Sequence, residues 1–111
     1  GFLLLSGDDA ITLPLIAAGA DGVISVVANS FPAQFSQMVT SALNGDFETA
    51  RKLHYDLLPV TKLLFAEGNP GGVKIALEEL GWMKPFMRLP LVQVSEGLKA
   101  KIVAETKKLI K

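Results

Sequence analysis

The first 45 residues of this chain carry almost no charge. They contain no lysine or arginine and only three acidic side chains, Asp8, Asp9 and Asp21, whereas residues 46–111 hold all eleven basic and the other eight acidic side chains. A free-standing domain solvates most of its surface with charged side chains. The first 45 residues therefore have the composition of a protein interior, and we expect other segments to cover them.

Two short apolar runs in this segment are typical of buried parallel strands. Residues 2–5 (FLLL) and 22–28 (GVISVVA) are rich in branched side chains and do not alternate apolar with polar residues, as in strands buried on both faces. Between them, residues 10–18 predict a helix with an aspartate as its cap and a glycine at its exit. Together they predict one βαβ unit, an α/β fold whose two strands leave unpaired edges and uncovered faces.

The remainder of the chain is predicted to be helical. Apolar residues recur at helical spacing, and caps and breakers divide the pattern. The expected elements are a helix that begins near Pro32, a long helix capped by Asp46, a short helix that ends at Gly81, a connector over residues 82–94 and a last helix capped by Ser95.

The best candidate for chemistry is the run Ser6-Gly7-Asp8-Asp9, which follows the first predicted strand. Ligands bind at the carboxyl ends of parallel strands in α/β folds. A glycine there permits close backbone approach, and two carboxylates could orient a substrate or hold a cation. The simpler interpretation is that one aspartate caps the next helix and the other is solvated.

Other kinds of site are poorly supported. His54 is the only histidine, and its neighbours Tyr55 and Asp56 do not share its helix face. No set of His, Asp and Glu has the spacing of metal ligands, cysteine is absent, and neither glycine-rich turn matches a phosphate-binding motif. We therefore expect no metal and no cofactor.

Charge and hydropathy exclude two classes of partner. Basic and acidic side chains cancel over the chain, which disfavours nucleic-acid binding. The longest apolar stretches fall far short of the roughly 20 residues that span a bilayer, and no basic segment precedes the N-terminal apolar run. We expect a soluble, cytoplasmic protein.

Five blocks of sequence, in order along the chain, resemble the dihydrodipicolinate synthase family. The blocks are FLLLSGDD (2–9), GVISVVAN (22–29), GDF (45–47), EGNP with VK (67–70 and 73–74) and LPL (89–91). The resemblance implies a class I aldolase on a (β/α)8 barrel, of which this chain is similar to the C-terminal part only. A complete barrel needs about 250 residues.

On this resemblance, residues 1–45 are strands seven and eight of the barrel with their helices, and residues 46–111 are the helical extension. The missing N-terminal barrel segment would then be the chain's main partner. The family condenses pyruvate with aspartate semialdehyde in lysine and diaminopimelate biosynthesis, commonly as a homotetramer. Pyruvate forms a Schiff base with a strand-six lysine, because an imine makes the ketone an electron sink.

The resemblance also assigns roles to single residues. The Schiff-base lysine lies upstream of Gly1, so we expect no catalytic residue in this chain and no activity from it alone. Ile24 matches the position whose backbone borders pyruvate, and Gly7 matches the position beside the semialdehyde. Asp8 is expected to help shape the binding site at the carboxyl end of strand seven, where Gly7 lies.

Two alternatives stay open at this point. An N-acetylneuraminate lyase would use the same fold and the same Schiff base, although its motifs after strands seven and eight differ from those present here. A non-catalytic helical module, whose two apolar strands dock on a partner protein, is the alternative from another class.

Overall fold

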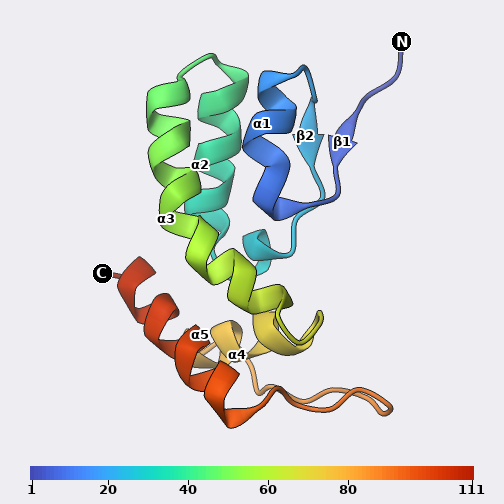
Figure 1. Ribbon diagram of the computed structural model, residues 1–111, viewed down its shortest axis with the longest axis vertical. Coiled ribbons are helices and arrows are strands. Elements are labelled where there is room, and N and C mark those ends of the chain that lie inside the picture. Colours follow the sequence, from blue (N-terminus) through green and yellow to red (C-terminus); the bar gives the residue numbers. More distant parts are fainter. The chain divides into compact units, whose positions relative to one another are not determined.

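The computed structural model describes residues 1–111, which form two compact units, Gly1–Leu58 and Pro59–Lys111. The elements in chain order are β1 (Leu5–Ser6), α1 (Thr12–Ala17), β2 (Gly22–Val23), α2 (Pro32–Leu43), α3 (Phe47–Phe65), α4 (Gly71–Glu79) and α5 (Glu96–Leu109) (Figure 1). Two short 3-10 helices, Asp9–Ile11 and Val27–Asn29, follow β1 and β2 respectively. The helix α3 begins in the first unit and ends in the second.

The predicted βαβ unit is confirmed. Strands β1 and β2 pair in parallel with Leu5 opposite Gly22, and α1 connects them (Figure 1). The Asp8 carboxylate accepts a hydrogen bond from the backbone N–H of Ala10 at 2.9 Å and so caps the helical segment. Gly19 has a φ of +113°, the backbone conformation that ends a helix at low cost only for glycine.

The predicted strands over residues 2–5 and 22–28 were too long. At the start of β1, the backbone N–H of Leu4 bonds the Asp21 carboxylate at 2.8 Å instead of a strand carbonyl. After β2, the chain leaves the extended conformation and turns into the 3-10 helix Val27–Asn29. Beside the short pairing, the Asp21 N–H donates to the Leu4 carbonyl at 2.8 Å and the Ile24 N–H to the Ser6 carbonyl at 2.9 Å, and beyond β2 a helical turn ends the extended segment.

The apolar side chains of these strand segments are largely exposed. Phe2 is 90% exposed, Leu3 76% and Ile24 73%. An open hollow of about 410 Å³ lies beside β2, and its lining includes Val23 of β2 and Val39 of α2. The first unit instead buries the side chains of its helices and turns, which include Leu13, Ile16, Val27, Phe31, Phe35 and Met38.

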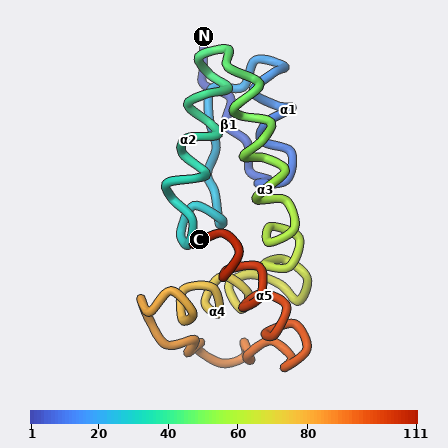
Figure 2. The backbone as a smooth tube through the Cα atoms, turned by 90° about the vertical axis from the view of Figure 1, so that its left-hand side faces the viewer, coloured from blue at the N-terminus to red at the C-terminus, as the bar shows by residue number.

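The second unit is held together by its helices. Figure 2 shows α4 and α5 side by side, and between them Lys99 pairs with Glu78 at 3.2 Å and Lys107 with Glu79 at 3.6 Å. The buried side chains of this unit include Val60, Leu64, Ile75, Ala76 and Ile102.

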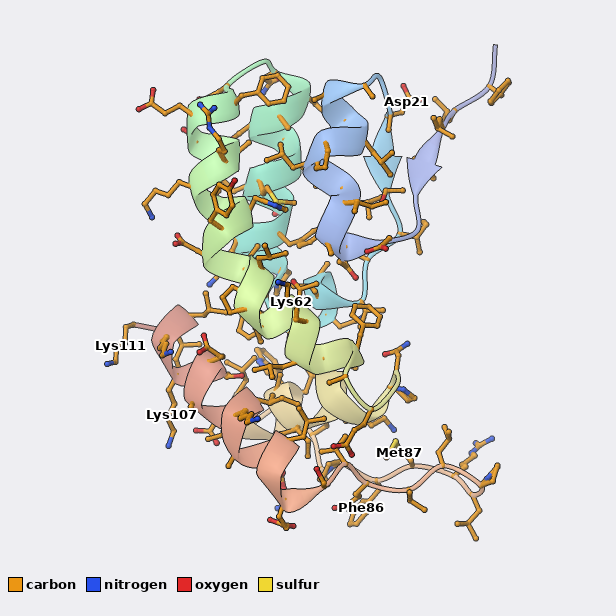
Figure 3. The ribbon with its side chains drawn as sticks, in the orientation of Figure 1. Asp21, Lys62, Phe86, Met87, Lys107 and Lys111 are labelled. Carbon is orange, nitrogen blue, oxygen red and sulfur yellow. The ribbon has the colours of Figure 1, made fainter.

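The remaining predictions of local structure are also confirmed. Residues 82–94, which include Phe86 and Met87 (Figure 3), contain no helix or strand, as the sequence predicts for a connector. The predicted caps Asp46 and Ser95 are in place, since each accepts a hydrogen bond from a backbone N–H in the first turn of its helix.

The cap Ser95 also binds Glu67 and fixes the pKa of that carboxyl group. The Glu67 carboxylate accepts hydrogen bonds from the Ser95 hydroxyl at 2.5 Å and the Ser95 backbone N–H at 2.9 Å, and these bonds lower the pKa of Glu67. Because the folded state prefers the ionised carboxylate, its stabilisation is present above the ordinary carboxyl pKa and is lost as the pH falls through the lowered one.

We expect the substitution Ser95→Ala to raise the pKa of Glu67 towards its ordinary value. The same change removes the hydroxyl that accepts the Leu98 N–H at 3.3 Å, and loss of such a cap costs about 1 kcal/mol. NMR titration of the Glu67 carboxyl carbon measures the pKa, with Ser36→Ala as a control, since Ser36 bonds only its own helix. An unchanged pKa of Glu67 in Ser95→Ala would contradict this assignment.

Candidate functional site

The carboxyl ends of β1 and β2 form one polar cluster. Ser6, the last residue of β1, is 2% exposed, and its hydroxyl lies 3.0 Å from the hydroxyl of Thr12. Both hydroxyls donate to the backbone carbonyl of Asp8 at 2.9 Å. The Ser6 hydroxyl also accepts from the Asp8 N–H at 3.2 Å. These bonds hold the turn after β1 in one conformation.

Asp8 and Gly7 face solvent in this turn. Asp8 is exposed and uses one carboxylate oxygen as the helix cap, which agrees with the simpler interpretation of one of the two aspartates. Gly7 is exposed as well, and a Cβ built on it would have no neighbour within 4 Å. The backbone at Gly7 is therefore open to an approaching ligand.

Asp9 is not the solvated carboxylate that the simpler interpretation predicts. It is 4% exposed, and its two oxygens accept hydrogen bonds from the hydroxyl of Ser25 and from the backbone N–H of Val26, the latter at 3.0 Å. The Ser25 hydroxyl in turn accepts from the Ala28 N–H at 2.9 Å. Asp9 thus ties the end of β1 to the segment that follows β2.

Ile24 directly follows β2, at the carboxyl end of the strand pair. Its backbone N–H donates to the carbonyl of Ser6 at 2.9 Å, while its side chain is exposed. The structure therefore brings all three residues that the sequence assigns to substrate contact, Gly7, Asp8 and Ile24, to the same end of the strand pair. Their roles in binding stay predictions.

Sequence reasoning missed Asp9 and Ser25 as partners. Two features could have paired them: each polar residue follows a predicted parallel strand, and the carboxyl ends of adjacent parallel strands share one edge. A carboxylate next to a buried strand end needs hydrogen-bond donors, and a serine after the neighbouring strand supplies one.

His54 lies apart from this cluster, on α3. Its ring centroid is 5.3 Å from that of Tyr55 in an edge-to-face arrangement. Partial burial lowers the pKa of the His54 imidazole. The contact joins the rings of two successive residues, although the helical spacing places their side chains on different faces.

Comparison with known proteins gives the chain its family. Residues 1–109 match the model of the dihydrodipicolinate synthetase family.

The chain belongs to this family.

Relatives named 4-hydroxy-tetrahydrodipicolinate synthase include one from Methanosarcina mazei, 49% identical over 108 residues, and one from Methanocaldococcus jannaschii, 54% identical over 93 residues. These matches cover 97% and 84% of this chain but only 37% and 32% of the relatives.

Solved structures of the family have the same fold over this region. The crystal structure of dihydrodipicolinate synthase from Thermotoga maritima matches with a TM-score of 0.94 and 40% identity, over 97% of this chain and 37% of that chain. The Aquifex aeolicus enzyme matches with a TM-score of 0.91 and 45% identity, over 96% and 36%. The chain thus spans little more than a third of the length of the dihydrodipicolinate synthases it resembles.

These findings do not favour the two alternatives considered from the sequence. The relatives named above are dihydrodipicolinate synthases and not N-acetylneuraminate lyases. Family membership over residues 1–109 likewise disfavours a non-catalytic helical module. None of the helices is both long enough and apolar enough to cross a membrane.

Proposed function

We propose that this chain is the C-terminal part of a (β/α)8 barrel, with β1 and β2 as its seventh and eighth strands. Residues 1–45 would complete the barrel, and residues 46–111 would form the helical extension. The observation that carries the proposal is a short strand pair whose flanking apolar residues, Phe2, Leu3 and Ile24 among them, expose their side chains. Side chains of this kind are buried in parallel sheets, which are covered on both faces.

Two further observations support the proposal that other barrel strands pack against this chain. The outer edge of β2 pairs with no strand, and the hollow beside it is lined mainly by apolar groups of β2 and α2. Matched relatives are more than two and a half times as long as this chain. A preceding barrel segment would supply both a strand for this edge and side chains for this hollow.

The complete protein, we infer, condenses pyruvate with aspartate semialdehyde. The names of the relatives support this reaction. A lysine amine forms an imine with the pyruvate carbonyl and releases water, loss of a methyl proton gives the enamine, and the enamine carbon attacks the aldehyde. On the same resemblance, we propose a cytoplasmic homotetramer.

The chain's own lysines are badly placed for this chemistry. All nine lie on helices α3, α4 and α5, in the connector or at the C-terminal end, and none lies on β1 or β2. Lys62, for example, lies on α3 (Figure 3). We propose that the Schiff-base lysine belongs to the preceding segment and that residues 1–111 contribute substrate contacts: the backbone of Ile24 for pyruvate, and Gly7 with Asp8 for the aldehyde.

The test uses a completed protein, in which the preceding segment of the Methanosarcina mazei relative is joined to Gly1. We expect it to consume pyruvate and aspartate semialdehyde together. Cleavage of N-acetylneuraminate with no condensation would overturn the proposal, and so would a well-folded completed protein that has neither activity.

A further inference from the structure

The carboxylate of Asp9 has both of its oxygens engaged by one short segment. One oxygen accepts from the Ser25 hydroxyl, and the other accepts from the Val26 N–H at 3.0 Å. At 4% exposure this carboxylate has little access to water. A buried carboxylate is costly unless such donors surround it, so the segment and the carboxylate hold each other in place.

The same segment carries Ile24, whose backbone is anchored on both sides. Before it, the Ile24 N–H donates to the Ser6 carbonyl at 2.9 Å. After it, the next two residues are the ones that Asp9 binds. The peptide that follows Ile24 is therefore fixed by the Asp9 carboxylate, while the Ile24 side chain stays 73% exposed.

We propose that Asp9 is a positioning residue for pyruvate: through Ser25 and Val26 it holds the backbone of Ile24 in the place where the substrate binds. This inference rests on the proposed function, which puts pyruvate beside Ile24. Asp9 acts through hydrogen bonds alone and neither touches the substrate nor transfers a proton. Small errors in the placement of a substrate-binding group can cost large factors in rate.

Asp21 provides a matched control at the opposite end of the strands. Its carboxylate also crosses from one βα unit to the other, accepting the Leu4 N–H at 2.8 Å, and it lies by the start of β2, away from the turn after β1 (Figure 3). Asp9 and Asp21 therefore each accept a backbone N–H bond between neighbouring strand segments, with Asp21 exposed and Asp9 buried. Only Asp9 lies at the end that carries the proposed site.

The experiment measures pyruvate KM and kcat in the completed protein with Asp9→Ala, Asp9→Asn and Asp21→Ala. We expect Asp9→Ala to raise the pyruvate KM about tenfold or more, because it removes two hydrogen bonds to a charged acceptor. Asp9→Asn should stay within about threefold of the unsubstituted protein, since its amide oxygen accepts from Val26 and its NH2 donates to the Ser25 oxygen. Asp21→Ala should leave the pyruvate KM unchanged.

Three outcomes would overturn the proposal. An unchanged pyruvate KM in Asp9→Ala shows that the hydrogen bonds from Ser25 and Val26 to Asp9 do not position the backbone of Ile24. Equal losses in Asp9→Ala and Asp21→Ala show general stabilisation of the strands. Equal losses in Asp9→Ala and Asp9→Asn show that the charge itself is needed, as for a substrate contact or a proton carrier.

A separate readout distinguishes failure of this inference from failure of the proposed function. If the unsubstituted completed protein does not condense its substrates, the proposed function fails. Amide hydrogen exchange at residues 24–26 then still tests whether the Asp9 carboxylate holds this segment in place. Exchange should be at least about tenfold faster in Asp9→Ala than in Asp9→Asn or Asp21→Ala, and equal rates in the three variants would contradict it.

Discussion

When borohydride is added in the presence of pyruvate, the isolated 111-residue chain should acquire no more reduced pyruvate than the same chain does in denaturant. In the completed protein it should attach one reduced pyruvate to one lysine upstream of Gly1. The reason is that the imine needs a lysine held beside the substrate in the barrel, whereas the lysines of this chain lie on helices, in the connector and at the C-terminal end. Condensation by the isolated chain should be at least about 10³-fold slower than by the completed protein.

Mass spectrometry of the digested product locates the label. Borohydride converts the C=N bond of the imine into a stable amine, so the modified peptide survives digestion. Stoichiometric labelling of any lysine within residues 1–111, by contrast, would refute the assignment of the reactive lysine to the preceding segment. The denatured chain controls for slow reaction at exposed lysines.

The substitution Gly72→Ala should strongly destabilise the helical extension. A Cβ at Gly72 would lie 2.5 Å from the carbonyl oxygen of Leu64 and 2.7 Å from its Cα. These are backbone atoms of the neighbouring helix, so the two helices must move apart. We expect a loss of about 3 kcal/mol, which lowers the Tm of the completed protein by roughly 5 °C.

Gly97→Ala is the matched control. Gly72 and Gly97 are each the second residue of a helix, α4 and α5 respectively, but a Cβ at Gly97 has no neighbour within 4 Å. Without a steric cost, alanine should stabilise α5 by about 0.5 kcal/mol, because it restricts the unfolded chain. Calorimetry measures the Tm of both variants and of the unsubstituted completed protein. A Tm of Gly72→Ala within 2 °C of the unsubstituted protein would contradict the close approach of Leu64 in solution.

Sequence patterns predicted the elements well where the rules are local. Helix α5 begins after its predicted cap Ser95, and α1 ends at Ala17, two residues before the predicted glycine exit, Gly19. In each case one side chain or one backbone conformation decides the boundary. Parallel pairing of the two strands could likewise be predicted, because a helix of this length joins them.

The strand ends could not be predicted, because contacts between distant residues decide them. The apolar run 22–28 predicts a strand, yet the carboxylate of Asp9 binds Ser25 and Val26 and the chain turns into a 3-10 helix. No pattern within the run reveals this partner. The same contact accounts for the main difference at the candidate site, since the simpler interpretation left one of the two aspartates solvated, whereas Asp9 is buried.

The central claim is that the apolar segments 2–5 and 22–28, from which β1 and β2 are formed, are interior parts of a barrel whose other strands are absent from this chain. Size-exclusion chromatography with light scattering, followed by a thermal melt, tests it directly on the isolated 111-residue chain. We predict self-association or aggregation, driven by exposed side chains such as Phe2 and Leu3. A compact monomer that melts cooperatively, with the amides of both strand segments protected from exchange, would contradict the claim.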